Sequence, residues 1–231
     1  MKKILFNISL SVLILFPISC LNEKKKDTIE IKEGFVGMIG YGSLMSLKSM
    51  EQTLGHKYKN SIYQVHLIDY NRGWTYFLPI NDPQSNSAED LKYYGFFLQN
   101  NDSIPFEGMV NLNIDPKKKS KINCILYLIA KEDLIKFDKR ETGYQKVDVT
   151  DKIKEYSFIG GRVYVYEHFP DHQYKSSSDI KKYILVKDYV DLITKACDSI
   201  GKNFRTEFDK STCPHSSQIV AYEKIVWKKA R

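Results

Sequence analysis

Two short segments of the chain have residue types and spacing that suit chemistry. The first, Gly40-Tyr41-Gly42-Ser43-Leu44, lies between an apolar run expected to be a buried strand (residues 35–41) and a helix start at Ser46. Glycines at such a junction let backbone N–H groups turn toward a ligand, and the helix that follows adds its positive end. This arrangement suits a carboxylate or an oxyanion. On residue types alone, a purely structural tight turn is the favoured interpretation.

The loop lacks the features of three common motifs. A dinucleotide fingerprint needs a third Gly where Met45 stands, and a phosphate loop needs a Gly-Lys-Ser/Thr run that does not follow. A nucleophile elbow needs Gly where Tyr41 and Met45 stand. The five His residues offer no identifiable base for Ser43 as a nucleophile. Beside the favoured structural turn, the functional interpretation left open is therefore binding by backbone donors and not covalent catalysis.

The second segment is residues 134–144, which end in Glu141-Thr-Gly-Tyr144. Helical spacing places Leu134, either Phe137 or Asp138, and Glu141 on one face, and we expect the apolar face to point at the core. Glu141 would then lie in an apolar environment at the negative end of a helix, and both effects oppose ionisation. A carboxylate with a raised pKa suits acid/base catalysis near neutral pH. Spacing alone slightly favours the alternative, in which Glu141 reaches solvent or pairs with Lys139 or Lys146.

The order of elements predicts the fold class. We expect strands at 35–41, 61–70, 73–78, 92–98, 108–114, 122–129, 144–149 and 161–166, and helices at 46–55, 131–140 and 185–201. Residues 102–105 and the basic run 115–119 are predicted turns, and residues 219–227 are a candidate last strand. The order is neither βαβ throughout nor all-β. It therefore predicts an α+β domain around a mixed, curved or barrel-like sheet with a few flanking helices.

The N-terminal residues indicate export. Two lysines precede an apolar stretch, residues 4–18, with the layout of a secretory signal. Pro17-Ile18-Ser19-Cys20 resembles a bacterial lipobox, so we expect a signal peptide at 1–19, a lipidated Cys20 with a polar tether at 20–33, and one domain at 34–231. Several acyl chains on Cys20 would anchor the protein to a membrane of the cell envelope, outside the cytoplasm. The alternatives are an ordinary cleaved signal, with Cys20 incidental, and a retained membrane anchor.

Composition argues against several classes of protein. The formal net charge is +7, but Lys and Arg fall in short runs interleaved with acids, which favours a solvated surface over a nucleic-acid interface. Cys124, Cys197 and Cys213 are odd in number and far apart, so we expect no disulfide framework, and Cys124 reads as a small buried hydrophobe. Cys213-Pro214-His215 is at most half a zinc site, because no second pair has ligand spacing. We expect neither metal nor cofactor, and the sequence names no protein partner.

In combination, the two segments resemble the γ-glutamylcyclotransferase superfamily. That family has a Tyr-Gly-Ser-[Asn/Leu] loop after its first strand and, much later, an Asp-x-x-Glu block followed by Gly and Tyr. Here these motifs read Tyr41-Gly42-Ser43-Leu44-Met45 and, after the apolar strand 122–129, Asp138-Lys139-Arg140-Glu141-Thr142-Gly143-Tyr144. The Leu-Met ending and the Arg-Glu pair are more similar to the glutathione-specific branch and its bacterial relatives. Weaker similarity at residues 69–74 and 183–204 extends the match over about residues 36–204.

The resemblance implies a reaction and roles for individual residues. In this family the α-amine of the substrate attacks its own γ-amide carbonyl, which closes 5-oxoproline and releases an amine or peptide without metal or cofactor. Glu141 would be the general acid/base, Tyr41, Gly42, Ser43 and Leu44 would hold the glutamyl group of a small γ-glutamyl compound, and Tyr144 would support them with its hydroxyl. The alternative is a non-catalytic exported binding or interaction module on the same fold, because a fold does not fix a function.

Overall fold

The fold was described from a computed structural model that covers residues 26–79, 93–99, 102–106, 108–169, 183–215, 221–222 and 225–229. The strands are β1 (Asp27–Glu30), β2 (Phe35–Gly40), β3 (Ile62–Pro79), β4 (Tyr93–Gln99), β5 (Asp102–Phe106), β6 (Gly108–Ala130), β7 (Tyr144–Asp148), β8 (Tyr156–Ile159), β9 (Val163–His168), β10 (Tyr183–Val186), β11 (Thr212–Cys213), β12 (Ala221–Tyr222) and β13 (Ile225–Lys229). The helices are α1 (Leu47–Leu54), α2 (Leu134–Arg140), α3 (Lys187–Ile200) and α4 (Lys202–Ser211), with short 3-10 turns η1 (Ser43–Met45), η2 (Lys131–Asp133) and η3 (Thr150–Lys152).

A mixed eight-stranded sheet organises the molecule. Its order is β11-β3-β6-β2-β9-β7, with β10 beside β6 and β12 beside β10. Antiparallel pairs (β2–β6, β3–β6, β7–β9) combine with parallel ones (β2–β9, β3–β11, β6–β10). The predicted α+β class with a mixed sheet is confirmed. Within the described residues no pairing joins β11 to β7, so the sheet is open rather than closed into a barrel.

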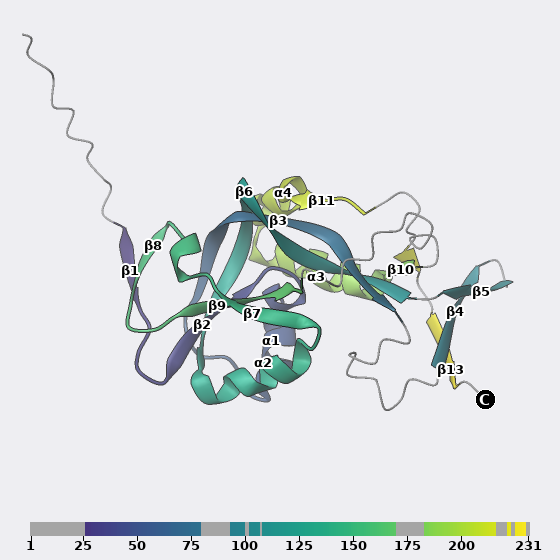
Figure 1. Ribbon diagram of the computed structural model, residues 1–231, viewed down its shortest axis with the longest axis horizontal. Helices are drawn as coiled ribbons and strands as arrows, with labels where there is room; N and C mark the ends of the chain where they lie inside the picture. Colours follow the sequence, from purple (N-terminus) through teal and green to yellow (C-terminus); the bar gives the residue numbers. More distant parts are fainter. Residues whose placement is uncertain are drawn as a thin grey trace, which may run out of the picture.

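The helices gather in two pairs (Figure 1). Helix α1 lies beside α2 on one side of the sheet, and α3 contacts α4 on another. The three-stranded sheet β13-β4-β5 lies apart from the main sheet at one end of the molecule. Strand β5 occupies residues for which a turn was predicted, so that prediction is wrong. Met38, Leu126, Phe137 and Ile193 are fully buried and bring β2, β6, α2 and α3 into one core.

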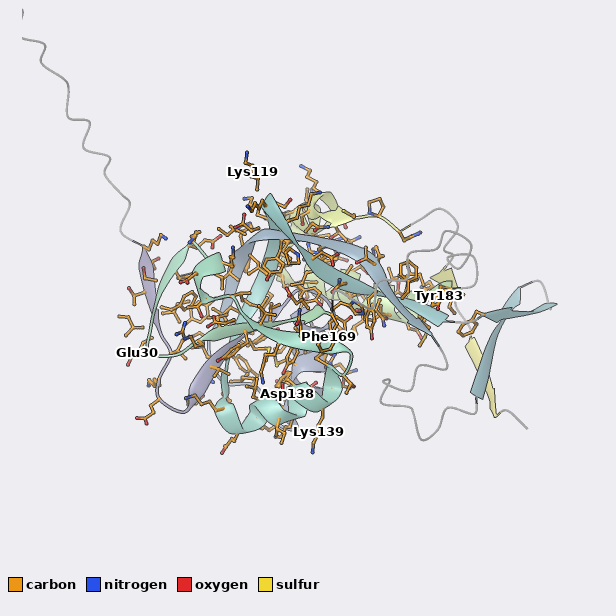
Figure 2. All side chains as sticks on the ribbon, viewed as in Figure 1. Glu30, Lys119, Asp138, Lys139, Phe169 and Tyr183 are labelled. Carbon is orange, nitrogen blue, oxygen red and sulfur yellow. The ribbon has the colours of Figure 1, made fainter. Side chains whose placement is uncertain are left out.

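Strands β3 and β6 are longer than the sequence predicts. Each was expected as two strands joined by a turn or loop, whereas the structure has continuous strands of 18 and 23 residues. The register slips between Ile68 and Tyr70, so that residues 117–120 of β6 face only Asp69. Asp69 and Lys119 both have positive φ there, and the predicted basic turn is in fact this bulge. Lys119 stands at the corner and points away from the body of the molecule (Figure 2).

Asp69 holds the bulge in place through its side chain. The Asp69 carboxylate accepts the Lys119 backbone N–H at 3.1 Å and binds Lys152 Nζ at 3.0 Å, so the acid holds the bend on both sides. A bulge of this kind bends and twists a strand locally. The polar residues that interrupt the apolar pattern of β6 are therefore the corner of one strand, and the chain is buried again at residues 122–127 beyond it.

The ends of some elements match the predictions and others differ. Helix α1 begins and ends as predicted: Ser46 Oγ accepts the Ser49 N–H at 3.3 Å, and Gly55 adopts a left-handed φ of 78°. The predicted helix 185–201 instead begins at Lys187, because Leu185 belongs to β10. At the N-terminus, β1 pairs in parallel with β8 and Ile29 is buried, so the fold extends into residues 27–31 of the expected tether.

The remaining N-terminal predictions lie outside the described residues. These are the signal peptide, the lipobox and Cys20. None of the four α-helices in the described part of the chain has the length and apolar character needed to cross a bilayer.

Candidate active site

The glycine-containing loop is shaped by a close approach of the chain to itself. Strand β2 ends at Gly40, and a Cβ placed there would lie 2.6 Å from the backbone oxygen of Leu44. The loop then closes through two short turns, in which Met45 N–H donates to Gly42 O at 2.9 Å and Ser46 N–H to Ser43 O at 3.1 Å. Only a glycine at position 40 allows this fold-back, which leads directly into α1.

Glu141 and Tyr144 are placed by the turn between α2 and β7. Glu141 is the C-terminal cap of α2: its N–H donates to Phe137 O at 2.8 Å, and its own carbonyl accepts the Tyr144 N–H at 3.0 Å. Gly143, with a φ of 89°, allows this tight return, and a Cβ there would collide with the hydroxyl of Tyr76. Phe137 is completely buried, and this orientation of α2 carries Glu141 inward at its end. The predicted helical face is confirmed.

The two segments meet in one pocket. It is lined by residues of β2, the glycine loop, β6, the α2–β7 turn, β9 and α3: Ile39, Tyr41, Gly42, Ser43, Leu44, Leu112, Glu141, Tyr144, Tyr166 and Tyr189. The free volume is about 30 Å³. Ligand pockets are commonly about 300–1,000 Å³, so the site is a narrow slit as it stands.

The Glu141 carboxyl sits in an environment that opposes its ionisation. Its side chain is 16% exposed and contacts Arg140, whose Nε lies 3.0 Å from Glu141 Oε1. Burial raises the pKa of this carboxyl above its ordinary value, and the Arg140 guanidinium only partly offsets the increase. The sequence correctly predicts the direction of this shift through desolvation.

The alternative partners of Glu141 are engaged elsewhere. Lys146 Nζ binds the Asp138 carboxylate at 2.9 and 3.0 Å, on the outer side of α2. Lys139 points away from the body of the molecule (Figure 2). The ion pair of Glu141 is therefore with Arg140, a neighbour in sequence that spacing arguments on a helix do not select.

Four phenols surround the carboxyl: Tyr41, Tyr144, Tyr166 and Tyr189. Burial is the main cause that raises the pKa of each of them, with Glu141 contributing in every case, so all four are neutral around pH 7. Tyr166 donates to Asp138 Oδ1 at 2.6 Å and Tyr144 to Leu112 O at 3.3 Å. Because these protons are committed to the protein, the two phenolic oxygens are free to accept hydrogen bonds from a donor in the pocket.

Arg72 contacts the loop through the backbone carbonyl of Tyr41. It is completely buried, and its guanidinium donates to Tyr41 O (3.3 Å), Asn123 O (2.8 Å) and Asn123 Oδ1 (2.8 Å). Two hydroxyls at the end of α4, Ser211 Oγ and Thr212 Oγ1, accept at 2.9 and 2.8 Å, and the ring of Phe208 stacks 3.9 Å below. Burial lowers the pKa of Arg72 to about 10, so it is still charged at neutral pH.

All six pocket residues singled out in the sequence are brought together. The four loop residues 41–44, together with Glu141 and Tyr144, line the same slit. Sequence reasoning missed Ile39, Leu112, Tyr166 and Tyr189. Tyr189 falls within the predicted helix 185–201 and Tyr166 within the predicted strand 161–166, with nothing in the sequence to mark either as a site residue. Only the packing of α3 and β9 beside the loop distinguishes these tyrosines from ordinary core residues.

Other candidate groups do not assemble. Cys124 and Cys197 are buried free thiols, as predicted for Cys124, and Cys213 is exposed. In the ranges that the structure describes, no three His, Cys, Asp or Glu side chains are arranged to hold a metal ion.

Comparisons with known proteins give fold-level likenesses. No family model matches the chain, and no curated protein matches it. Among solved structures, a γ-glutamyl cyclotransferase is 13% identical, with a TM-score of 0.45, over 79% of this chain and 90% of that one. The solution structure of an Arabidopsis thaliana protein is 15% identical, with a TM-score of 0.34, over 62% of this chain and 78% of that one. Identities and scores of this size do not assign an activity.

Proposed function

We propose that the protein is a γ-glutamylcyclotransferase-like enzyme that converts a γ-glutamyl group to 5-oxoproline and releases an amine or peptide. One observation carries the proposal. The Tyr41–Leu44 loop and Glu141 belong to the two segments that resemble the family's motifs, and they line the same pocket although 97 positions separate Leu44 from Glu141 in the sequence. Among the described residues that line the pocket Glu141 is the only acid, and burial raises the pKa of its carboxyl.

The chemistry needs few groups because the attack is intramolecular. The α-amine nitrogen forms a bond to the γ-carbonyl carbon, and the bond from that carbon to the leaving nitrogen breaks. Orientation alone supplies effective molarities of about 10⁵–10⁸ M in well-placed intramolecular reactions. Glu141 takes the proton that the ammonium must lose and delivers it to the leaving nitrogen, so that protons balance over the cycle.

The environment of Glu141 suits both halves of this transfer. An amine is far more basic than an ordinary carboxylate, and raising the carboxyl pKa narrows that gap. The N–H groups of the loop and the Ser43 hydroxyl would bind the substrate carboxylate or the developing oxyanion. The phenolic oxygens of Tyr144 and Tyr166, whose protons are committed to Leu112 O and Asp138, would accept from the α-ammonium.

The first experiment measures 5-oxoproline release by the full-length protein in detergent. Substrates are glutathione and a panel of γ-glutamyl amino acids and γ-glutamyl amines. We expect turnover by the wild type and a loss of at least about 100-fold in Glu141→Gln, the scale of one general acid/base. Glu132→Gln, an exposed acid at the start of the same helical segment, is the matched control and should retain full activity. No turnover on any substrate would refute the proposal.

The pocket volume favours a second candidate function. With about 30 Å³ free, a glutamyl group enters only if lining side chains move, and a site that opens without placing the bound amine against Glu141 would be a binding module without catalysis. Saturable binding of a γ-glutamyl compound, seen by ligand-detected NMR without 5-oxoproline formation, would support this function instead.

We also propose that the protein is an exported lipoprotein of the cell envelope, held to the membrane through Cys20. The proposal rests on the N-terminal sequence alone. Metabolic labelling with a radioactive fatty acid should mark the wild type and not Cys20→Ala. Equal labelling of the two proteins would contradict it.

A further inference from the structure

The residue before Glu141 makes more contacts around the candidate site than Glu141 itself. Arg140 Nε faces Glu141 Oε1 at 3.0 Å. Its Nη1 donates to Ser49 O at 3.1 Å and Thr53 Oγ1 at 2.5 Å, both on α1. Its Nη2 donates to Ser49 Oγ and to Ser43 Oγ, each at 2.9 Å. A guanidinium has five N–H donors; the two Nη atoms make four hydrogen bonds here, and Nε forms the ion pair with Glu141.

These contacts join three pieces of the site. Ser43 belongs to the glycine loop, Ser49 and Thr53 belong to α1, and Glu141 ends α2. No backbone hydrogen bond between the loop and the Glu141 turn is among those found in the described residues, so Arg140 is a direct polar link between them. A lysine has three donors on one nitrogen and cannot reproduce this set.

We propose that Arg140 is a positioning residue: it holds the Ser43 hydroxyl and the Glu141 carboxylate in a fixed relation and keeps that carboxylate available as a base. The role of Arg140 in turnover rests on the proposed function, whereas its role in holding Ser43 and Glu141 does not. Arg140 is absent from the pocket lining, so it acts through the groups it holds and not by contact with a substrate.

The charge around Glu141 gives the inference a measurable consequence. The ionisable groups that face Glu141 in the described structure are Arg140 from α2, Tyr41 from the loop, Tyr144 from β7, Tyr166 from β9 and Tyr189 from α3. All four phenols are neutral near pH 7, because burial raises their pKa values. Arg140 is then the one cation that opposes the desolvation of the carboxyl, and removing it must raise the pKa of Glu141 further.

Two substitutions separate charge from geometry. Arg140→Gln removes both the cation and most of the N–H donors, whereas Arg140→Lys keeps the cation and loses the planar guanidinium group that reaches several acceptors at once. The matched control is Arg205→Lys, since Arg205 is similarly exposed (31% against 28% for Arg140) and also holds carboxylates, those of Asp198 and Asp209, away from the pocket. All three proteins are first checked for a cooperative unfolding transition.

The readouts are the Glu141 carboxyl titration by ¹³C NMR, amide hydrogen exchange at residues 43–46, and the pH profile of kcat/KM. In Arg140→Gln we expect the titration midpoint and the acid limb to move up by about 1–3 pH units, the usual effect of an adjacent guanidinium. In Arg140→Lys we expect the Glu141 midpoint to rise by at most about half as much as in Arg140→Gln, because the cation is kept. We also expect faster amide exchange in the loop and a lower kcat with little change in KM. Arg205→Lys should match the wild type in all three.

The outcomes distinguish failure of the inference from failure of the proposed function. A folded Arg140→Gln with an unchanged Glu141 midpoint and unchanged loop exchange overturns the inference, whatever the activity. If the wild type shows no turnover, the proposed function fails, while the titration and the exchange still decide whether Arg140 positions these groups. If Arg140→Gln does not fold, Arg140→Lys decides through loop exchange and the kcat against KM split.

Discussion

Replacing Arg72 by Met should strongly destabilise the protein, although no carboxylate among the described residues forms an ion pair with this guanidinium. The guanidinium donates to three carbonyl oxygens, Tyr41 O, Asn123 O and Asn123 Oδ1, and the Asn123 side chain is itself held by its hydrogen bond to Phe204 O. The Ser211 and Thr212 hydroxyls lose little, because both also donate to Phe208 O. The structural damage is therefore concentrated in the three carbonyl oxygens.

The magnitude follows from these three groups. A buried polar group left without a partner costs about 1–3 kcal/mol, so the three together cost about 3–9 kcal/mol. Removing a buried charge gives part of this back, since burial is the main cause that lowers the Arg72 pKa to about 10. We therefore expect a net loss of about 4 kcal/mol, large against a total stability of about 5–15 kcal/mol.

Urea unfolding followed by tryptophan fluorescence measures this change. With a slope of about 2–3 kcal/mol per molar urea, the midpoint should fall by about 1.5 M. Arg162→Met is the control, because Arg162 is 66% exposed and pairs only with Asp148 at the surface, so its change should stay within about 0.5 kcal/mol. A midpoint for Arg72→Met within 0.3 M (roughly) of the wild type would refute the reasoning and show that the three carbonyls find water.

Two further predictions test the site. Burial raises the Glu141 pKa in the folded state, so the protonated carboxyl contributes stability that is present below its unfolded pKa and lost as pH rises through the folded value. The stability of Glu141→Gln relative to the wild type should therefore increase between about pH 4 and about pH 7.5. A difference in urea midpoint between the two proteins that is the same at both pH values would contradict this. The loop glycines should differ: Gly40→Ala clashes with the Leu44 backbone and should lower the melting temperature by several degrees, on the order of 5 °C. Gly42→Ala meets its neighbours, including Tyr189 Oη at 3.7 Å, at ordinary contact distances, so it should melt near the wild type while reducing ligand binding, and calorimetry with a binding titration checks both.

The sequence predicts local features of the fold well where one short-range rule operates. The start and end of α1 follow from Ser46 and Gly55, whose effects act within four residues. The long strands were missed because Asp69 and the lysines near 119 carry turn propensity, and only pairing with a neighbouring strand absorbs them as a bulge. Propensity cannot distinguish a turn that reverses the chain from a corner that continues it.

The candidate site shows the same division. The motif residues Ser43 and Glu141 were identifiable from residue type and order, and their proximity in space is what the structure adds. Tyr189 was not identifiable, because a tyrosine in an apolar helical stripe usually means core packing. Arg140 was not identifiable for a different reason. Four of its polar contacts are with residues 87–97 positions earlier in the chain and the fifth is with its neighbour Glu141, and no helical periodicity encodes such contacts.

The narrowness of the slit between the loop and α3 has a thermodynamic consequence for any ligand. If the form that admits a ligand is a minor population, the measured dissociation constant equals the intrinsic one divided by that population. An open fraction of roughly 1% would weaken the apparent affinity about 100-fold, although every contact in the bound state is unchanged. The side chains that line the slit, Tyr189 among them, then set the affinity by controlling how often the pocket is open, and trimming them should tighten binding.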